Sequence, residues 1–182
     1  SKVLPHFSEL IIVDNGSQDN SIKNAITACE KLQPKIKCKV FKNRDNLGLG
    51  GSHKVAFNYA IDQGFDYLVV IHGDDQGNVQ ELCEIMESGT YKNYDSLLGA
   101  RFLKDSNLIG YEKLRILGNI TLNKLCSVLI KYPVYDLGSG LNMYDVNFLK
   151  SRFYHNFPNS LVFNVSMLFY SIHVKSKFLL FP

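Results

Sequence analysis

Short apolar runs alternate with amphipathic segments through the first half of the chain. The runs are too short for helices and are bounded by turn residues, a pattern typical of buried strands. Three such strands are predicted, in ELIIVD (9–14), DYLVVI (66–71) and SLLGAR (96–101), and IKCKVF (36–41), in which apolar and polar residues alternate, is predicted as a further strand.

Between these strands, apolar residues recur at the spacing of a helix face. The first predicted helix runs from Ile22 to Leu32 and the third over 79–86. We interpret NRDNLGLGG (43–51) as a loop and expect the second helix to begin at a capping Ser52. This alternation predicts an α/β fold with a doubly wound, mostly parallel sheet and helices on both faces.

The pattern changes after residue 101. A long amphipathic helix is predicted between Tyr111 and Ile130, then a loop and short strand within 132–145, a helix over 161–172 and a last strand in KFLLF (177–181). With no internal repeat or linker, residues 1–182 are predicted to form one domain. The chain lacks an initiating Met and ends abruptly, so we expect a fragment of a longer protein.

Composition narrows the possible functions. The chain has 182 residues and a formal net charge of +3, with no basic run that would suggest a nucleic-acid partner. No apolar run reaches the ~18 residues that a membrane span needs. The four cysteines show no metal-binding spacing, and we interpret them as reduced, buried thiols.

Polar side chains gather where the predicted strands end. Asp14, His72, Asp74 and Arg101 all lie at carboxyl ends of strands, where open α/β sheets bind their ligands. Asp14 could accept hydrogen bonds from a nucleotide base or ribose, or it could cap the following turn. A phosphatase of the haloacid-dehalogenase type needs a second Asp two positions later, where this chain has Gly16.

The stretch HGDDQ (72–76) is the sharpest candidate for a metal site. Carboxylate oxygens suit Mg²⁺ and Mn²⁺, Mn²⁺ tolerates imidazole better, and such ions share their coordination sphere with substrate phosphates. An acidic surface turn is the alternative interpretation. NLGLGG (46–51) does not meet the G-x-G-x-x-G spacing of a dinucleotide site, so we interpret it as a turn that lets backbone approach closely.

These motifs occur together in one order: IIVDNGSQDNS, NLGLGGSHKVAFNYAI, YLVVIHGDDQ, LLGARF and YDLGSGLNMYDVNFL. In that order they resemble the family 2 glycosyltransferases of the GT-A fold. The dolichol-phosphate mannose synthase and polyprenyl-phosphate glycosyltransferase branch is the most similar. The resemblance covers about residues 9–182.

The resemblance implies roles for particular residues. Asp14 and Asn46 fall where the family contacts the nucleotide, and Asp136 falls on the Asp of the branch's D-L-T-G-S-F-R segment, a candidate general base. Arg101 and Arg115 fall where the branch places cations for an acceptor phosphate. The D-x-D-x-Q segment that binds a divalent metal on the donor diphosphate corresponds to His72, Asp74 and Gln76.

The chain also departs from the family pattern. His72 replaces an anionic metal ligand, Asn142 replaces the Arg of D-L-T-G-S-F-R, and Ser166 replaces a Glu of the late F-Q-M-E helix. The family's first strand is missing, so we expect a sheet truncated at that strand.

From this resemblance we expect an inverting glycosyltransferase that moves a sugar from a nucleotide-diphosphate sugar to a polyprenyl phosphate, with Mg²⁺ or Mn²⁺ as cofactor. It would be membrane-associated, at the cytoplasmic face, in cell-envelope polysaccharide biosynthesis. Three alternatives stay open: transfer to a glycan hydroxyl with Asp136 as base, a catalytically silent nucleotide-binding domain, and a nucleotidyltransferase.

Overall fold

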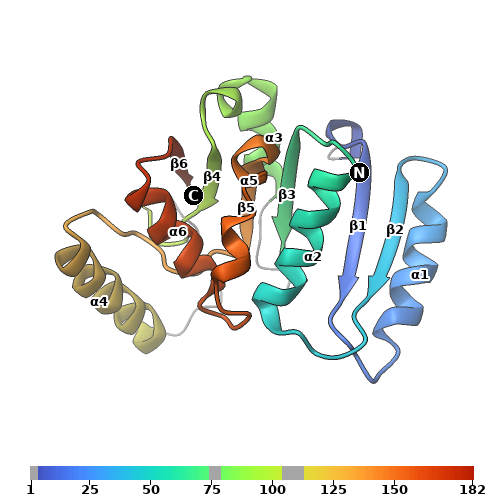
Figure 1. Ribbon diagram of the computed structural model, residues 1–182, viewed down its shortest axis with the longest axis horizontal. Coiled ribbons are helices and arrows are strands. Elements are labelled where there is room, and N and C mark those ends of the chain that lie inside the picture. Colours follow the sequence, from blue (N-terminus) through green and yellow to red (C-terminus); the bar gives the residue numbers. More distant parts are fainter. Residues whose placement is uncertain (1–3, 74–78, 104–112) are drawn as a thin grey trace.

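The computed structural model describes residues 4–73, 79–103 and 113–182 (Figure 1). For Leu4 and residues 113–115 it describes the backbone alone. The described strands are β1 (Glu9–Asp14), β2 (Lys37–Lys42), β3 (Tyr67–Ile71), β4 (Ser96–Gly99), β5 (Leu141–Asp145) and β6 (Phe178–Phe181). The described helices are α1 (Ser21–Leu32), α2 (Gly48–Asp62), α3 (Val79–Glu87), α4 (Lys113–Ile130), α5 (Val146–Leu149) and α6 (Phe163–His173), with short 3-10 helices η1 (Leu4–His6), η2 (Thr90–Asn93) and η3 (Phe153–Asn156).

The described strands form two sheets. β1 and β2 pair in parallel, and the second sheet has the order β3-β5-β4-β6. β6 is parallel to β4, whereas β5 is antiparallel to both of its neighbours. The α/β class is confirmed. The direction of β5 was not predicted, because the apolar pattern of LNMYD is the same whichever way the strand runs.

Helices cover both faces of the four-stranded sheet, as the sequence predicts. Tyr144 of β5 packs in one core with Phe57 of α2 and Met167 of α6. Its neighbour Met143 points to the other face and packs in a second core with Leu82 of α3. Successive residues of a strand alternate between faces, so each core receives every second side chain. Figure 1 shows α2, α5 and α6 together on one side of this sheet.

A disulfide joins α1 to β2, which corrects the interpretation of all four cysteines as reduced thiols. Cys29 and Cys38 are bonded, with their Cα atoms 5.4 Å apart, while Cys83 and Cys126 carry free thiols. Both bonded cysteines are buried where the helix packs on the strand. Sequence spacing could not reveal the bond, because it depends on how α1 lies over β2.

The predicted start of the second helix is also wrong. α2 begins at Gly48 rather than at Ser52, and Ser52 instead accepts a hydrogen bond from Asn43 (3.3 Å). The glycines of this segment suggested a loop, but in the structure they allow the start of α2 to pack closely against neighbouring backbone. A Cβ atom on Gly50 would lie 2.6 Å from the carbonyl oxygen of Pro158.

Candidate functional site

Three asparagines join the loops that follow β1 and β2. Asn15 Oδ1 accepts hydrogen bonds from Asn43 Nδ2 (3.1 Å) and from the Leu47 amide (2.9 Å), and Asn15 Nδ2 donates to Asn46 Oδ1 (2.8 Å). Gly16 makes the close approach possible: its φ is +79°, and a Cβ there would lie 2.9 Å from the Asp45 carbonyl carbon. The cluster fixes both loops at the carboxyl ends of their strands.

The two predicted nucleotide-binding residues, Asn46 in this cluster and Asp14 beside it, have structural partners. Asp14 is buried at the end of β1, and its Oδ2 accepts a hydrogen bond from the Ser17 amide (3.1 Å). Asn46 Oδ1 also accepts from the Gly48 amide (2.8 Å) at the start of α2. The structure thus brings Asp14 and Asn46 to neighbouring loops, and their contact with a nucleotide stays a prediction.

The first turns of α2 extend from this asparagine cluster to the end of β3. His53 on α2 lies with its ring centroid 5.5 Å from that of His72, the two rings being almost perpendicular. His72 follows β3 directly, and its amide donates to the Gly140 carbonyl (2.8 Å). His72 is therefore held between α2 and the segment 136–140.

Burial makes His53 a neutral side chain. Desolvation lowers its pKa from 6.5 to about 4, a shift that the nearby His72 reinforces and that the hydrogen-bonded Leu49 carbonyl (2.9 Å from Nδ1) partly opposes. To donate to that carbonyl, the neutral imidazole must carry its proton on Nδ1. Its Nε2 then has no proton. Sequence analysis missed His53, since a lone His on a helix carries no motif.

We expect His53 to make stability depend on pH between 6.5 and 4. In that range the unfolded chain binds a proton that the folded chain excludes, so the free energy of unfolding falls as pH falls, by about 3 kcal/mol in total. Above pH 6.5 the contribution is constant. Urea unfolding at several pH values should show that His53→Gln lacks this part of the slope and that His173→Gln, an exposed control, keeps it. Parallel curves for wild type and His53→Gln would contradict the assignment.

Arg101 and Asp136 form an ion pair at the carboxyl end of β4, in which the carboxylate is buried and the guanidinium partly exposed. Arg101 Nε and Nη2 donate to Asp136 Oδ2 (2.7 Å) and Oδ1 (2.9 Å), and the Arg101 amide donates to Oδ2 as well (3.0 Å). The Asp136 side chain is 2% exposed and that of Arg101 27%. Such a bidentate pair fixes the orientation of the guanidinium.

The segment 136–140 connects this ion pair to His72. Arg101 Nη2 also donates to the Gly138 carbonyl (2.9 Å), and the Gly138 amide donates to Asp136 Oδ1 (3.0 Å). At the other end of the segment, a Cβ on Gly140 would lie 3.1 Å from His72 Nδ1. The segment 136–140 thus connects Arg101, Asp136 and His72, which lie far apart in the sequence.

Other predicted site residues cannot be placed. Asp74 and Gln76 lie outside the described residues, and Arg115 lies in α4 where only the backbone is described. Within the described ranges, no group of three or more His, Cys, Asp or Glu side chains could hold a metal ion. Of the predicted ligands, the structure places His72 alone, beside the loop that holds Arg101.

Comparison with known families decides what kind of domain this is. Residues 5–153 match the family model described as glycosyl transferase family 2. The chain belongs to this family. As a family 2 glycosyltransferase domain it has the GT-A type of α/β fold that the motifs predicted, and the matched range contains β1 to β5 together with Asp14, His72, Arg101 and Asp136.

Curated relatives of this family 2 domain are distant. An uncharacterized protein, MJ1222 of Methanocaldococcus jannaschii, is 24% identical over 76% of this chain and 54% of its own length. The UDP-N-acetylglucosamine--dolichyl-phosphate N-acetylglucosaminyltransferase of Methanococcus voltae is 23% identical over 80% of this chain and 61% of its own. The polyprenol monophosphomannose synthase of Mycolicibacterium smegmatis is 21% identical over 74% and 50%. The chain spans half to three-fifths of the length of these relatives.

Proposed function

We propose that this family 2 domain transfers a sugar from a nucleotide-diphosphate sugar to a polyprenyl phosphate. The observation that carries the proposal is the state of Asp136. Its carboxylate accepts four hydrogen bonds, three from Arg101 and one from the Gly138 amide. A carboxylate offers about four acceptor positions in all. Asp136 is thus poorly suited to take a proton from an acceptor hydroxyl.

An anionic acceptor removes the need for a base. A phosphate oxygen is already a nucleophile, and what it requires is a cation that holds it in position and offsets its charge. Arg101, whose guanidinium is oriented by Asp136 and whose side chain is partly exposed, is the cation that we assign to this role. Asp136 then acts as a positioning residue for Arg101.

The names of two relatives support the same acceptor class. One transfers N-acetylglucosamine to dolichyl phosphate and the other makes polyprenol monophosphomannose. We carry over the class of reaction, a sugar moved to a polyprenyl phosphate. The sugars in the names of these two relatives differ, and only one name states a nucleotide, so we propose neither for this chain.

We further propose that a divalent cation, Mg²⁺ or Mn²⁺, binds the donor diphosphate through Asp74 with His72 and Gln76. Such an ion offsets the charge that develops on the diphosphate as the sugar leaves. Mn²⁺ suits an imidazole better than Mg²⁺ does, which makes Mn²⁺ the preferred ion if His72 takes part. The backbone bond to Gly140 and the contact with His53 hold His72 at the end of β3.

The outward face of α4 supports action at a membrane surface. Leu117, Val128 and Leu129 are 62%, 74% and 71% exposed, whereas the inward face carries the buried Asn123. Asn123 donates to the Tyr135 carbonyl (2.6 Å), so polar contacts fix that face inward. The helix therefore presents exposed, large apolar side chains to solvent, which is typical of a helix that lies in a membrane interface.

The charges around this face fit an anionic lipid surface. Lys124 and Lys131 border the apolar stripe, and the sequence has no Asp or Glu from Lys113 to Tyr135. Lysine at such a border can bury its stem and keep its ammonium at the headgroups. No described helix has both the length and the hydrophobicity to span a bilayer.

We expect the double variant Val128→Asn/Leu129→Asn to lose binding to vesicles of phosphatidylglycerol and phosphatidylcholine in co-sedimentation. Burying two large apolar side chains contributes about 3–6 kcal/mol at most, so the loss should exceed tenfold. Leu161→Asn, which changes an equally exposed leucine outside α4, is the matched control and should bind normally. Equal binding by the double variant would contradict the role of α4.

Donor turnover tests the proposed reaction. The complete protein, a panel of nucleotide sugars and a short polyprenyl phosphate should release nucleoside diphosphate only when a cognate sugar nucleotide and the lipid phosphate are both present. The proposal would be overturned if the rate of nucleoside diphosphate release did not depend on the lipid phosphate, or if release required an oligosaccharide instead.

A further inference from the structure

The backbone carbonyl of Ser139 accepts hydrogen bonds from two buried side-chain amides. The donors are Asn142 Nδ2 (3.2 Å) and Asn164 Nδ2 (3.0 Å). Asn142 lies on β5 and is 3% exposed, and Asn164 lies in the first turn of α6 and is 8% exposed. A carbonyl oxygen has two lone pairs, so these two amides use both of its acceptor positions.

The residues on either side of Ser139 are bonded to the candidate site. The Gly138 carbonyl accepts from Arg101 Nη2 (2.9 Å), and the Gly140 carbonyl accepts from the His72 amide (2.8 Å). Both neighbours are glycines, which lose more conformational freedom on folding than other residues and therefore need external contacts to be ordered. The two amide bonds supply such contacts, because they tie the middle of the segment 136–140 to β5 and α6.

Gly99 of β4 leaves the room that Ser139 needs. A Cβ atom on Gly99 would lie 2.4 Å from Ser139 Oγ and 2.7 Å from the Leu141 carbonyl oxygen. The Ser139 hydroxyl in turn donates to that carbonyl (3.1 Å). Ser139 is therefore packed between the end of β4 and the start of β5, where its carbonyl can reach both amides.

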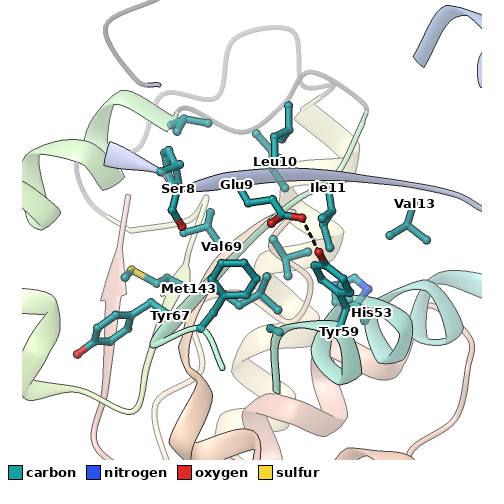
Figure 2. Close-up of a pocket in the computed structure, with 18 of the residues that line it drawn as sticks. Ser8, Glu9, Leu10, Ile11, Val13, His53, Tyr59, Tyr67, Val69 and Met143 are labelled. Carbon is teal, nitrogen blue, oxygen red and sulfur yellow. Dashed lines mark hydrogen bonds between the residues drawn. The ribbon is translucent and has the colours of Figure 1, made fainter. Parts of the chain in front are cut away.

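The first turn of α6 also reaches His72, through His53. The ring centroid of Phe163 lies 5.1 Å from that of His53, which lies 5.5 Å from that of His72. Figure 2 shows His53 on α2 among residues that line a cavity of about 750 Å³ between β1 and β3, and His72 lines the same cavity. One turn of α6 thus contacts the residues that hold His72 and the segment that holds Arg101.

Stability of the core alone does not account for an asparagine at position 164. Among the described residues, its Oδ1 is buried and has no hydrogen-bond partner. Burying a polar atom in this way costs free energy, and an apolar side chain would avoid that cost. The contact that gives the amide a role is the bond from Nδ2 to Ser139.

We propose that Asn142 and Asn164 are positioning residues for Arg101. By holding the Ser139 carbonyl they fix the adjoining Gly138 carbonyl, which orients the Arg101 guanidinium for the acceptor phosphate. The inference rests on the proposed function, because it assigns both amides to the acceptor side of that reaction. Asn142, which stands where the family segment has an Arg, then holds the loop that presents a cation.

The variants Asn142→Ala and Asn164→Ala of the complete protein test this role. Each leaves the Ser139 carbonyl one donor, so we expect the KM for a short polyprenyl phosphate to rise about two- to tenfold. The double variant leaves no donor and should raise this KM by more than the product of the single effects, because the two bonds share one acceptor. The KM for the nucleotide sugar should stay close to the wild-type value.

Tyr154→Phe is the matched control, because it removes one hydrogen bond of a buried side chain outside the candidate site. The lost bond runs from the Tyr154 hydroxyl to Asn58 Oδ1 (2.8 Å). The control should lower stability to urea as the single variants do and leave the acceptor KM unchanged. An equal rise of this KM in the control, or no rise in either single variant, would overturn the proposal. If circular dichroism shows that the double variant does not fold, the single variants decide.

Hydrogen exchange at the Gly138 amide, measured by NMR, does not depend on sugar transfer. This amide donates to Asp136 Oδ1 (3.0 Å), so its exchange rate reports how well the segment is ordered. In Asn164→Ala we expect about three- to tenfold faster exchange at Gly138, with a smaller change at Met143 of β5. Equal acceleration at both amides would show general destabilisation and overturn the proposal. A wild-type protein whose turnover does not depend on polyprenyl phosphate would overturn the proposed function instead, and exchange at Gly138 would still show whether the two amides hold the loop.

Discussion

The Asp74→Ala variant of the complete protein is expected to lose about 10² or more of its metal-dependent turnover at saturating donor and acceptor. Asp74 matches the second carboxylate of the family's metal-binding segment, and it would hold the cation that offsets charge on the leaving diphosphate. The measurement is the rate of nucleoside diphosphate release as Mn²⁺ or Mg²⁺ is varied.

Asp75→Ala is the matched control, because it removes the neighbouring carboxylate from the same segment. It should keep most of the rate at saturating metal. If Asp74→Ala retains wild-type turnover, or if both variants lose the same factor, Asp74 is not the principal ligand. A divalent ion bound elsewhere would then have to be sought.

Asp136→Asn should both destabilise the fold and weaken acceptor binding. Removing one partner of a fully buried ion pair costs about 3–5 kcal/mol, and because Arg101 is partly exposed we expect a smaller loss here. Since Asp136 positions Arg101, we also expect a higher KM for polyprenyl phosphate with a smaller change in kcat. Urea unfolding and initial rates over a range of acceptor concentrations measure the two effects.

The chain contains a suitable control for this variant. Asp62 and Arg152 form an ion pair that is 60% and 41% exposed, with an Nη2–Oδ1 distance of 2.6 Å. An exposed pair contributes about 0–1 kcal/mol, so Asp62→Asn should be nearly neutral and leave the acceptor KM unchanged. If Asp136→Asn lowers kcat by 10² to 10⁴ with an unchanged KM, Asp136 is a general base and the acceptor is a hydroxyl.

The order of strands and helices could be predicted from the sequence because each element has a local pattern. ELIIVD, DYLVVI and SLLGAR are continuous apolar runs, and each corresponds to a strand in the structure. What could not be predicted depends on contacts between distant residues. The Cys29–Cys38 bond is set by tertiary packing, which leaves no trace in local periodicity.

The candidate site also combines features that could be predicted from the sequence with features that depend on contacts between distant residues. Asp14, His72 and Arg101 could be predicted as site residues from their position. They are polar residues at the carboxyl ends of strands, where open α/β sheets bind their ligands. The pairing of Arg101 with Asp136 could not be predicted from the sequence, because α4 separates the two residues along the chain. That pairing changed the role proposed for Asp136 from candidate base to positioning residue, and it supports the polyprenyl phosphate acceptor that the resemblance implied.

The linkage in the product tests the central proposal most directly. The complete protein is given one cognate nucleotide sugar together with equal amounts of a short polyprenyl phosphate and an oligosaccharide, and the labelled product is treated with mild acid. We predict a lipid-soluble glycosyl phosphate that mild acid cleaves. A water-soluble glycoside that resists the same treatment would contradict the account.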